Sequence, residues 1–272
     1  MSESLARRYG DIAAVPAIPS NDHLELLLSH RSVRAYANRP LAEGLLEALV
    51  VAAQSAANSS NIQITSVVAV DDPALKTRLA ELSGHQPYIA QASVFLVWVA
   101  DYRRAVGIAQ EQGQALAHLD YLEVALNGFS NASIAAQNAA VAAESFGLGT
   151  VYIGGLRNHM DEVIALLGLP QHTFPTFGMC VGYPARTDDQ AERVKPRLPV
   201  RHVLHRNRYD EAAFSAADAE AFDATIRQFY QAQDLEKPAW SRQVIERLRT
   251  VESLHGRHRL KEILAGQGFG LA

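Results

Sequence analysis

One stretch of the chain, residues 117–146, constrains the fold more than any other. Its apolar residues recur at helical spacing, and Gly147 follows in the position where a glycine ends many helices. The second half is dense in alanine, at positions 132, 135, 136, 139, 140, 142 and 143. Because such small side chains let neighbouring elements approach closely, we expect one long, central helix that also lies at a subunit contact.

Short apolar runs that are rich in β-branched and aromatic residues predict buried strands at 66–70, 94–100 and 176–181. A further strand should follow Gly147 and end at Gly154 and Gly155. Helices are predicted at 4–9, 22–28, 73–82, 216–230 and 241–254, from Pro40 to about 55, and from a cap at Asn158 to 167. This mixture predicts an α+β protein with a central, mostly antiparallel sheet flanked by helices.

Composition excludes several classes of function. The 272 residues carry a formal net charge of -4 without a block of like charges, which argues against nucleic-acid binding. The single cysteine, Cys180, excludes an internal disulfide and cysteine-rich zinc sites, and its apolar surroundings predict a buried structural thiol. The N-terminus has no apolar signal-peptide core and no run approaches membrane-spanning length, so we expect a cytoplasmic protein without a membrane partner.

Two basic segments, His30 to Arg34 and Arg193 to Arg208, are suited to a small anionic ligand. In the first, His30, Arg31, Ser32 and Arg34 could surround a phosphate, with Ser32 and Arg34 on one face of an extended segment. In the second, prolines fix an extended backbone, so that Lys195 and Arg197 project together as a phosphate clamp. Taken separately, each segment is more often a solvated, solvent-facing turn than a ligand site.

Two uncharged segments could hold a flat ligand. Gly147 closes a helix and precedes a strand, an order that excludes the dinucleotide-binding glycine fingerprint. Gly154 and Gly155, at the end of that strand, would let a ring lie against the main chain, although a bare turn is the alternative. The polar loop from Asn58 to Gln63 could hold ribityl hydroxyls or phosphate oxygens, or could be a capped loop.

Other catalytic patterns are missing from the sequence. The segment Gly128-Phe-Ser130 faintly resembles a hydrolase nucleophile elbow, but it lies within a helical pattern. The close histidine pairs 202/205 and 255/258 have no third ligand nearby, so we predict no metal site. There is no phosphate-binding Walker loop and no paired-carboxylate site, which fits an enzyme whose cofactor performs the chemistry.

In this order, the segments resemble the nitroreductase family, specifically its bacterial NADPH-dependent, oxygen-insensitive nitro/flavin reductases. The resemblance covers roughly Asp22 to Tyr209. The matching pieces are His30-Arg-Ser-Val-Arg, the Ser/Asn loop with Gln63, Ser83-Gly-His-Gln86, Ala136-Gln-Asn-Ala, Ala143-Glu-Ser-Phe-Gly-Leu-Gly, Val151-Tyr-Ile-Gly-Gly-Leu-Arg, Leu169-Pro-Gln-His and Lys195-Pro-Arg-Leu-Pro.

The resemblance implies a three-layer, intertwined homodimer with one FMN at each of two sites between the chains. By position, the phosphate end of FMN would be held by His30, Arg31, Ser32, Lys195 and Arg197. Arg34 would approach the pyrimidine edge and Gln86 the polar edge of the ring. The adjoining loop would contribute Ser59, Ser60 and Gln63, and the ring near N5 would be lined by Ile153, Gly154 and Gly155.

The implied reaction is a ping-pong hydride transfer from NADPH through N5 of FMN to an electron-poor acceptor, without a protein nucleophile. The acceptors are nitroaromatics and quinones, with metal ions and free flavin as further candidates. The implied organisation is an N-terminal arm at 1–21, an FMN-binding core at 22–209 and a helical extension at 210–272 that packs on the dimer. The alternatives are a flavin reductase that supplies reduced flavin to a partner monooxygenase, a non-catalytic flavin carrier or sensor, and an interaction scaffold.

The sequence departs from the family pattern at two places. Asn61 stands where close relatives have an aromatic residue beside the flavin loop. The segment Glu236-Lys-Pro-Ala stands where relatives carry adjacent arginines associated with the 2′-phosphate of NADPH. Since Lys237 could partly replace those arginines, we expect a preference for NADPH over NADH.

Overall fold

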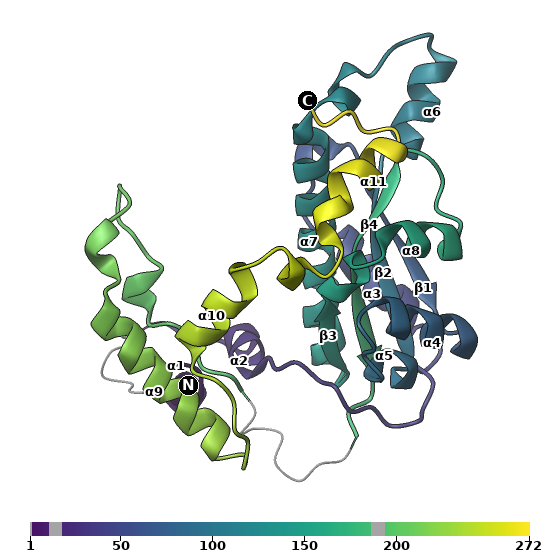
Figure 1. Ribbon diagram of the computed structural model, residues 1–272. Coiled ribbons are helices and arrows are strands. Elements are labelled where there is room, and N and C mark those ends of the chain that lie inside the picture. The colour runs from purple at the N-terminus through teal and green to yellow at the C-terminus, as the bar shows by residue number, and fades with distance from the viewer. Residues whose placement is uncertain (1, 11–17, 186–193) are drawn as a thin grey trace. The chain divides into compact units, whose positions relative to one another are not determined.

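The computed structural model describes residues 2–10, 18–185 and 194–272, which form two compact units (Figure 1). The helical unit combines Met1–Arg31 with Thr187–Ser253, and the sheet unit combines Ser32–Arg186 with Leu254–Ala272. The predicted division into arm, core and extension at residues 22 and 210 concerns function and stays a prediction. Arg193, at the start of the second basic segment, lies outside the described residues.

The sheet unit is built on four antiparallel strands. These are β1 (Thr65–Val70), β2 (Val94–Asp101), β3 (Gly149–Ile153) and β4 (Thr173–Gly182), in the order β1-β2-β4-β3. Strand β4 is buried along its whole length, and it begins three residues earlier than the apolar run that predicted it. The predicted α+β class and the antiparallel sheet are confirmed.

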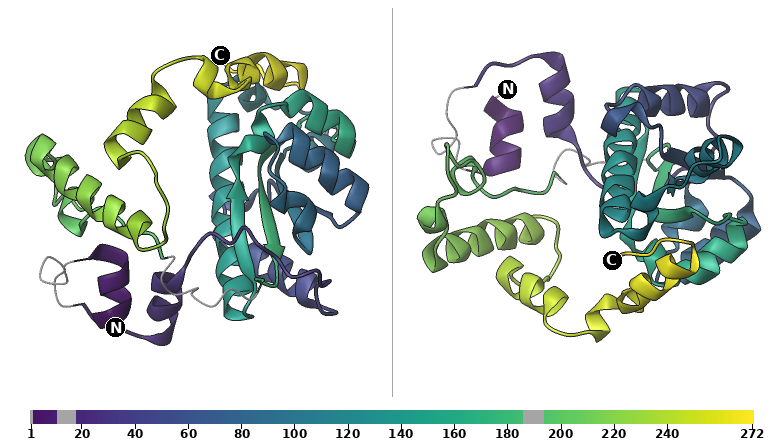
Figure 2. Two further views of the ribbon diagram at one scale, coloured as in Figure 1. Left: turned by 60° about the horizontal axis from the view of Figure 1, so that its bottom comes forward. Right: turned by 90° about the horizontal axis from the view of Figure 1, so that it is seen from above.

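Helices cover both faces of this sheet and make three layers (Figures 1 and 2). Because side chains alternate along a strand, Phe95 and Val97 of β2 point into one core, while Leu96 and Trp98 point into the other. The first core is covered by α4 (Pro73–Leu82), α5 (Tyr88–Gln91) and α8 (Met160–Leu167). The second is covered by α3 (Leu45–Gln54) and the long α7 (Leu122–Ser145), which pack on each other.

Helix α7 is the alanine-rich helix that the sequence predicted. Its alanines at 132, 136, 139 and 143 are fully buried against the sheet and α3. Gly147, at φ +74°, follows the end of the helix as expected. The beginning of the prediction was wrong: residues 117–120 form a separate 3₁₀ turn, because the extended backbone of Tyr121 interrupts the helix.

Three other helix boundaries differ from the prediction. Helix α3 begins at Leu45 rather than Pro40, because Gly44 before it is left-handed at φ +76°. Asn158 does not cap α8; it follows a 3₁₀ turn at Gly154–Arg157, and His159 precedes the helix. Helix α10 (Trp240–Leu248) ends six residues before the predicted boundary at 254. Three helices were not predicted: α5, α6 (Arg103–Glu111) and α11 (Leu260–Gly266).

The helical unit contains α1 (Ser2–Tyr9), α2 (Asp22–Ser29), α9 (Ala216–Gln231) and α10, and the predictions for α1, α2 and α9 are confirmed. Helix α9 begins with a capping box in which Ser215 and Asp218 bond each other's backbone N–H groups. It packs on α10 through the rings of Phe222 and Trp240, whose centroids lie 5.1 Å apart.

A third core cluster of the sheet unit is closed by residues 267–272. The ring of Phe269 is 1% exposed and packs edge-on against Tyr102 and Phe174. The side chain of Gln267 donates to the carbonyl of Thr173 over 2.9 Å, and the Gly270 N–H donates to the carbonyl of Leu119 over 2.8 Å. These contacts make the segment part of the core. Among the described residues, no helix is long and apolar enough to cross a membrane.

Candidate functional site

The segment Ser83–Gln86 packs directly on the glycine pair at the end of β3. A Cβ atom added to Gly155 would lie 2.3 Å from the carbonyl oxygen of Ser83 and 2.7 Å from Nε2 of Gln86. Gln86 is held in place because Nε2 donates to the Ser83 carbonyl over 2.5 Å, while Oε1 accepts from the hydroxyl of Tyr88. Gly155 is therefore required by packing within the chain, and it brings Gln86 beside the glycine pair.

Gly154 has an open face instead. A Cβ atom added there would meet only Nη2 of Arg157, at an ordinary contact distance of 3.7 Å. Ile153 is 1% exposed and belongs to the first core, so that only its main chain can face a ligand. Of the three residues predicted to line a ring, Gly154 is thus the one that leaves space for it. Among the described residues, the buried hydroxyl of Ser83 has no hydrogen-bond partner.

The first basic segment is extended, as predicted. Ser32 forms an isolated parallel bridge with Thr150 of β3, and the Val33 N–H donates to the Thr150 carbonyl over 2.9 Å. Val33 is 4% exposed, whereas Ser32 and Arg34 on either side of it are exposed. Their side chains consequently project from the edge of the sheet at the strand that carries the glycine pair.

The remaining predicted phosphate-binding residues belong to the helical unit: His30, Arg31, Lys195 and Arg197. Lys195 and Arg197 are exposed on either side of the buried Pro196, and their role as a phosphate clamp stays a prediction. The structure adds Arg8 of α1, which sequence reasoning missed. Its guanidinium is 5% exposed and donates to the carbonyl oxygens of Leu28, His30 and Lys195.

The polar loop from Asn58 to Gln63 has an unusual backbone. Ser60, Asn61 and Gln63 all have positive φ, at 48°, 55° and 54°. Such conformations cost free energy in residues other than glycine and persist only where the surroundings enforce them. Here the Ser59 N–H donates to Oδ1 of the buried Asn131 over 2.9 Å, and the side chain of Gln63 donates to that of Asn61 over 2.5 Å.

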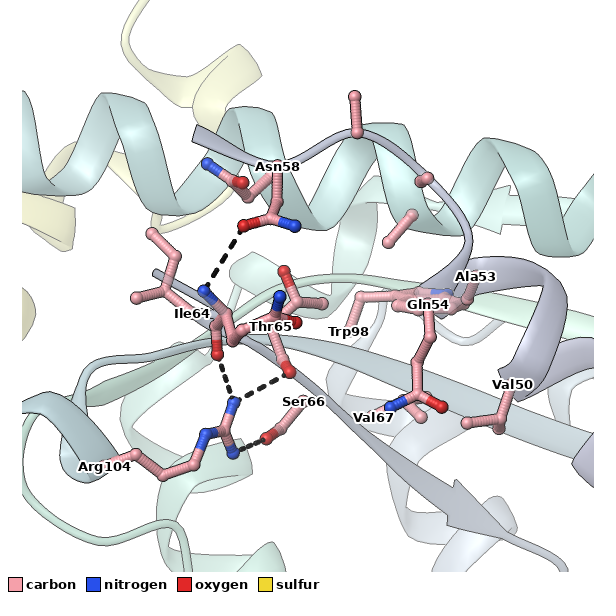
Figure 3. Close-up of a pocket in the computed structure, with 15 residues that line it drawn as sticks. Val50, Ala53, Gln54, Asn58, Ile64, Thr65, Ser66, Val67, Trp98 and Arg104 are labelled. Carbon is pink, nitrogen blue, oxygen red and sulfur yellow. Dashed lines mark hydrogen bonds between the residues drawn. The ribbon is translucent and has the colours of Figure 1, made fainter. Parts of the chain in front are cut away.

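Arg104 of α6 fixes the end of this loop (Figure 3). Its guanidinium donates to the carbonyls of Gln63 and Thr65, over 2.6 and 3.0 Å, and to the hydroxyl of Ser66 over 2.9 Å. Asp101 accepts from the same guanidinium over 2.8 Å and neutralises its charge. A pocket of about 330 Å³ lies beside the loop, between α3, α7 and β1. These hydrogen bonds therefore hold the end of a loop that borders an open pocket.

Arg157 was also missed, although it ends one of the matching segments. Its guanidinium donates to the carbonyl of Thr176 and lies 5.3 Å from the ring centroid of Phe129. Burial lowers the pKa of this guanidinium, and the charge of Arg257 acts in the same direction. The cation therefore lies beside Gly154 in a poorly solvated environment.

Cys180 agrees with its sequence interpretation as a buried structural thiol, and His202 and His205 have partners within the chain. Burial raises the pKa of the Cys180 thiol, as expected for a structural cysteine in the core. His202 bonds the carbonyl of Ala213, and His205 stacks on Tyr209. Across the described parts of the chain, no group of three His, Cys, Asp or Glu side chains could hold a metal ion.

Comparison with known proteins identifies the family. The family model described as "Nitroreductase family" matches residues 27–183, and "Nitroreductase family, C-terminal domain" matches residues 195–272. The NADPH-flavin oxidoreductase of Vibrio harveyi is 37% identical over 84% of this chain and 91% of its own. The FMN reductase (NADPH) of Bacillus subtilis is 37% identical over 83% of this chain and 90% of its own.

The fold comparison gives the same result. The crystal structure of nitroreductase A from Vibrio parahaemolyticus is 36% identical, covers 93% of this chain and 99% of its own, and superimposes with a TM-score of 0.82. The resemblance inferred from the sequence motifs is confirmed, and the chain belongs to the nitroreductase family.

Proposed function

We propose that this protein is an FMN-dependent oxidoreductase that takes its electrons from NADPH and reduces electron-poor small molecules such as nitroaromatics and quinones. The observation that carries the proposal is the arrangement at the end of β3. There, Gly155 packs against Ser83 and Gln86, while Gly154 leaves a face open to a flat ring. The relatives named above as an NADPH-flavin oxidoreductase and an FMN reductase (NADPH) support the choice of cofactor and donor.

Bound FMN would supply the redox chemistry, by accepting a hydride and passing electrons on. The chain's own residues position it. The ring would lie over Gly154, with the side chain of Gln86 at its polar edge and Arg34 at its pyrimidine edge, where negative charge develops. A fixed cation at that edge lowers the cost of reduction. In the helical unit, His30, Arg31, Lys195 and Arg197 would hold the phosphate end together with Ser32.

We also propose a homodimer in which a second copy supplies Ser59, Ser60 and Gln63. Strands β1 and β3 are three strand spacings apart, which is roughly 14 Å. Thr65 aligns through β2 with Phe174, whereas Ile153 aligns with Gly178, which separates the two strand ends by about 13 Å more along the sheet. A ring on Gly154 is therefore out of reach of the same chain's loop at 58–63.

The surface of α7 supports the dimer. Leu122, Leu126 and Phe129, at helical spacing, are 51%, 55% and 37% exposed in the single chain. A row of large apolar side chains on a central helix is typical of a face that another subunit covers. We further propose that the protein is cytoplasmic and that it prefers NADPH to NADH because Lys237 contacts the 2′-phosphate.

A second candidate is a flavin reductase, the activity that the name of one relative states, and such an enzyme would release reduced FMN to a partner monooxygenase. The two functions differ in how tightly FMN is retained. If FMN exchanges with free flavin within one turnover, release to a partner is favoured. If FMN stays bound over many turnovers while a nitroaromatic or quinone is consumed, direct reduction of the acceptor is favoured.

The test is an anaerobic visible spectrum of the purified, FMN-reconstituted protein, recorded before and after adding NADPH or NADH. We expect a protein-bound flavin spectrum that NADPH bleaches faster than NADH. Failure to retain FMN would contradict the cofactor assignment. Retained flavin that neither nucleotide reduces would leave a flavin carrier or sensor.

A further inference from the structure

Arg8 lies in α1, before the first residue matched by either family model. Arg8 is only 5% exposed, and a long charged side chain is rarely buried unless partners satisfy it. We propose that Arg8 is a positioning residue for the cofactor phosphate, so that the N-terminal helix is a working part of the FMN site. The inference rests on the proposed function, because it assumes that His30, Lys195 and Arg197 hold that phosphate.

Arg8 joins the two segments that carry these residues. Nη1 donates to the carbonyl of Lys195 over 3.0 Å, and Nη2 donates to the carbonyls of His30 and Leu28 over 2.7 and 2.6 Å. The main chain of the same residue contributes as well, since its carbonyl accepts from the N–H of Arg197 over 2.8 Å. A planar, rigid guanidinium thus fixes the main chain at 30 and 195, two positions far apart in the sequence.

The backbone of the clamp lacks the regular hydrogen bonds of a helix or a strand, so that contacts such as those of Arg8 fix it. Residues 194–199 belong to neither a helix nor a strand, and two of them, Pro196 and Pro199, have no N–H to donate. Exposed cations on a freely moving segment would lose conformational entropy when they close on a phosphate. With both carbonyls bound to Arg8, that ordering is present before the ligand arrives.

The end of α2 provides a second reason for the position of Arg8. Leu28 lies in the last turn of the helix, where carbonyl groups have no intrahelical partner and carry the negative end of the helix dipole. The guanidinium satisfies the Leu28 carbonyl there, and so fixes the direction in which the chain leaves the helix towards His30. The first basic segment therefore starts from a defined point.

The experiment compares FMN with riboflavin, which has the same ring and ribityl chain but lacks the phosphate. The dissociation constants of both ligands are measured for the wild type, Arg8→Ala, Arg8→Lys and the control Arg7→Ala. Arg7 is the neighbouring arginine, its side chain is 42% exposed, and its ion pair with Glu3 lies outside the clamp. Thermal unfolding of each ligand-free variant shows whether the fold is retained.

We expect Arg8→Ala to weaken FMN binding about tenfold, the loss that corresponds to one charge-assisted hydrogen bond, and to leave riboflavin binding unchanged. Arg8→Lys, whose single ammonium cannot span both segments, should lose part of the preference for FMN, and Arg7→Ala should keep all of it. If Arg8→Ala does not fold, the ratio of the riboflavin and FMN dissociation constants is taken from Arg8→Lys instead.

Three results would overturn the inference. A variant at Arg8 that loses affinity for FMN and riboflavin by the same factor would show a general structural role. A variant at Arg8 that keeps the wild-type preference would show no role at the phosphate. In both cases the proposed function stands, provided that the wild type prefers FMN. A wild type without that preference would refute the phosphate assignment and this inference together.

Discussion

Alanine substitutions at the two adjacent glycines at the end of β3 should have opposite effects. One should reduce stability and the other should weaken FMN binding, so that each variant serves as the control for the other. In Gly155→Ala the new methyl group would lie 2.3 Å from the Ser83 carbonyl, and the backbone must shift to admit it. Overpacking of this kind costs about 1–3 kcal/mol. At about 2–4 °C per kcal/mol for a chain of this size, the melting temperature should fall by roughly 2–12 °C.

Gly154→Ala should leave the fold intact, because its methyl group finds only Nη2 of Arg157 at 3.7 Å. Restricting the unfolded chain could even add about 0.4–1 kcal/mol of stability. The same methyl group would occupy the face on which the flavin is proposed to lie, so FMN binding should weaken. Gly155→Ala should weaken FMN binding only through the displacement of Gln86.

The assay combines thermal unfolding of the ligand-free protein with FMN titration for both variants. A stable Gly155→Ala protein would refute the packing argument, since the carbonyl contact leaves no room for the methyl group. A Gly154→Ala protein that binds FMN as tightly as the wild type would remove the open face from the cofactor site. The two results are independent, because one concerns contacts within the chain and the other concerns the ligand.

Three further predictions concern residues outside the glycine pair. Arg104→Ala removes a hydrogen bond to Gln63, at the end of the loop at 58–63, and another to Thr65, at the start of β1, about 1 kcal/mol each. Hydrogen exchange of the loop amides should therefore speed up, whereas Arg103→Ala, at the exposed neighbour, should not change it. Phe269→Ala should reduce the free energy of unfolding by about 3–5 kcal/mol in urea, and an unchanged urea midpoint would contradict its place in the core. Burial raises the pKa of Cys180, so the thiol should stay protonated through the pH range in which a free cysteine titrates. It should therefore react with a thiol-specific disulfide reagent only after unfolding, and rapid labelling of the native protein would refute this.

Elements with strong local signals were predictable from the sequence. Helix α4 covers the predicted range because Pro73 occupies its first turn and Asp72 caps it, with Oδ1 accepting from the Leu75 N–H over 2.7 Å. The apolar runs predicted β1 and β2 within one residue at each end. In these places the local preference and the tertiary structure agree.

The missed features depend on contacts between distant parts of the chain. Helix α6 begins with Arg103 and Arg104 at the end where the helix dipole disfavours cations. Arg104 is satisfied there by Asp101 and by the carbonyls of Gln63 and Thr65, which are distant in the sequence. Arg8 and its carbonyl partners at 30 and 195 have no common local pattern. The reason for Gly155 also differs from the one predicted: it makes room for Ser83 and Gln86, and only Gly154 leaves space for a ligand.

The closing segment 267–272 has a consequence for the order in which the protein folds during its synthesis. At typical translation rates, Phe269 is made about 5–20 s after Phe174, the strand residue whose ring it contacts. Until then, a nascent sheet unit must expose the side of Ile64, Tyr102 and Phe174 that Phe269 later covers. The helical unit also stays incomplete for much of synthesis, because α1 and α2 are made long before the segment at 195 that Arg8 binds. We therefore expect both units to complete their folding late in synthesis. Until then, each unit exposes apolar surface to which a chaperone can bind.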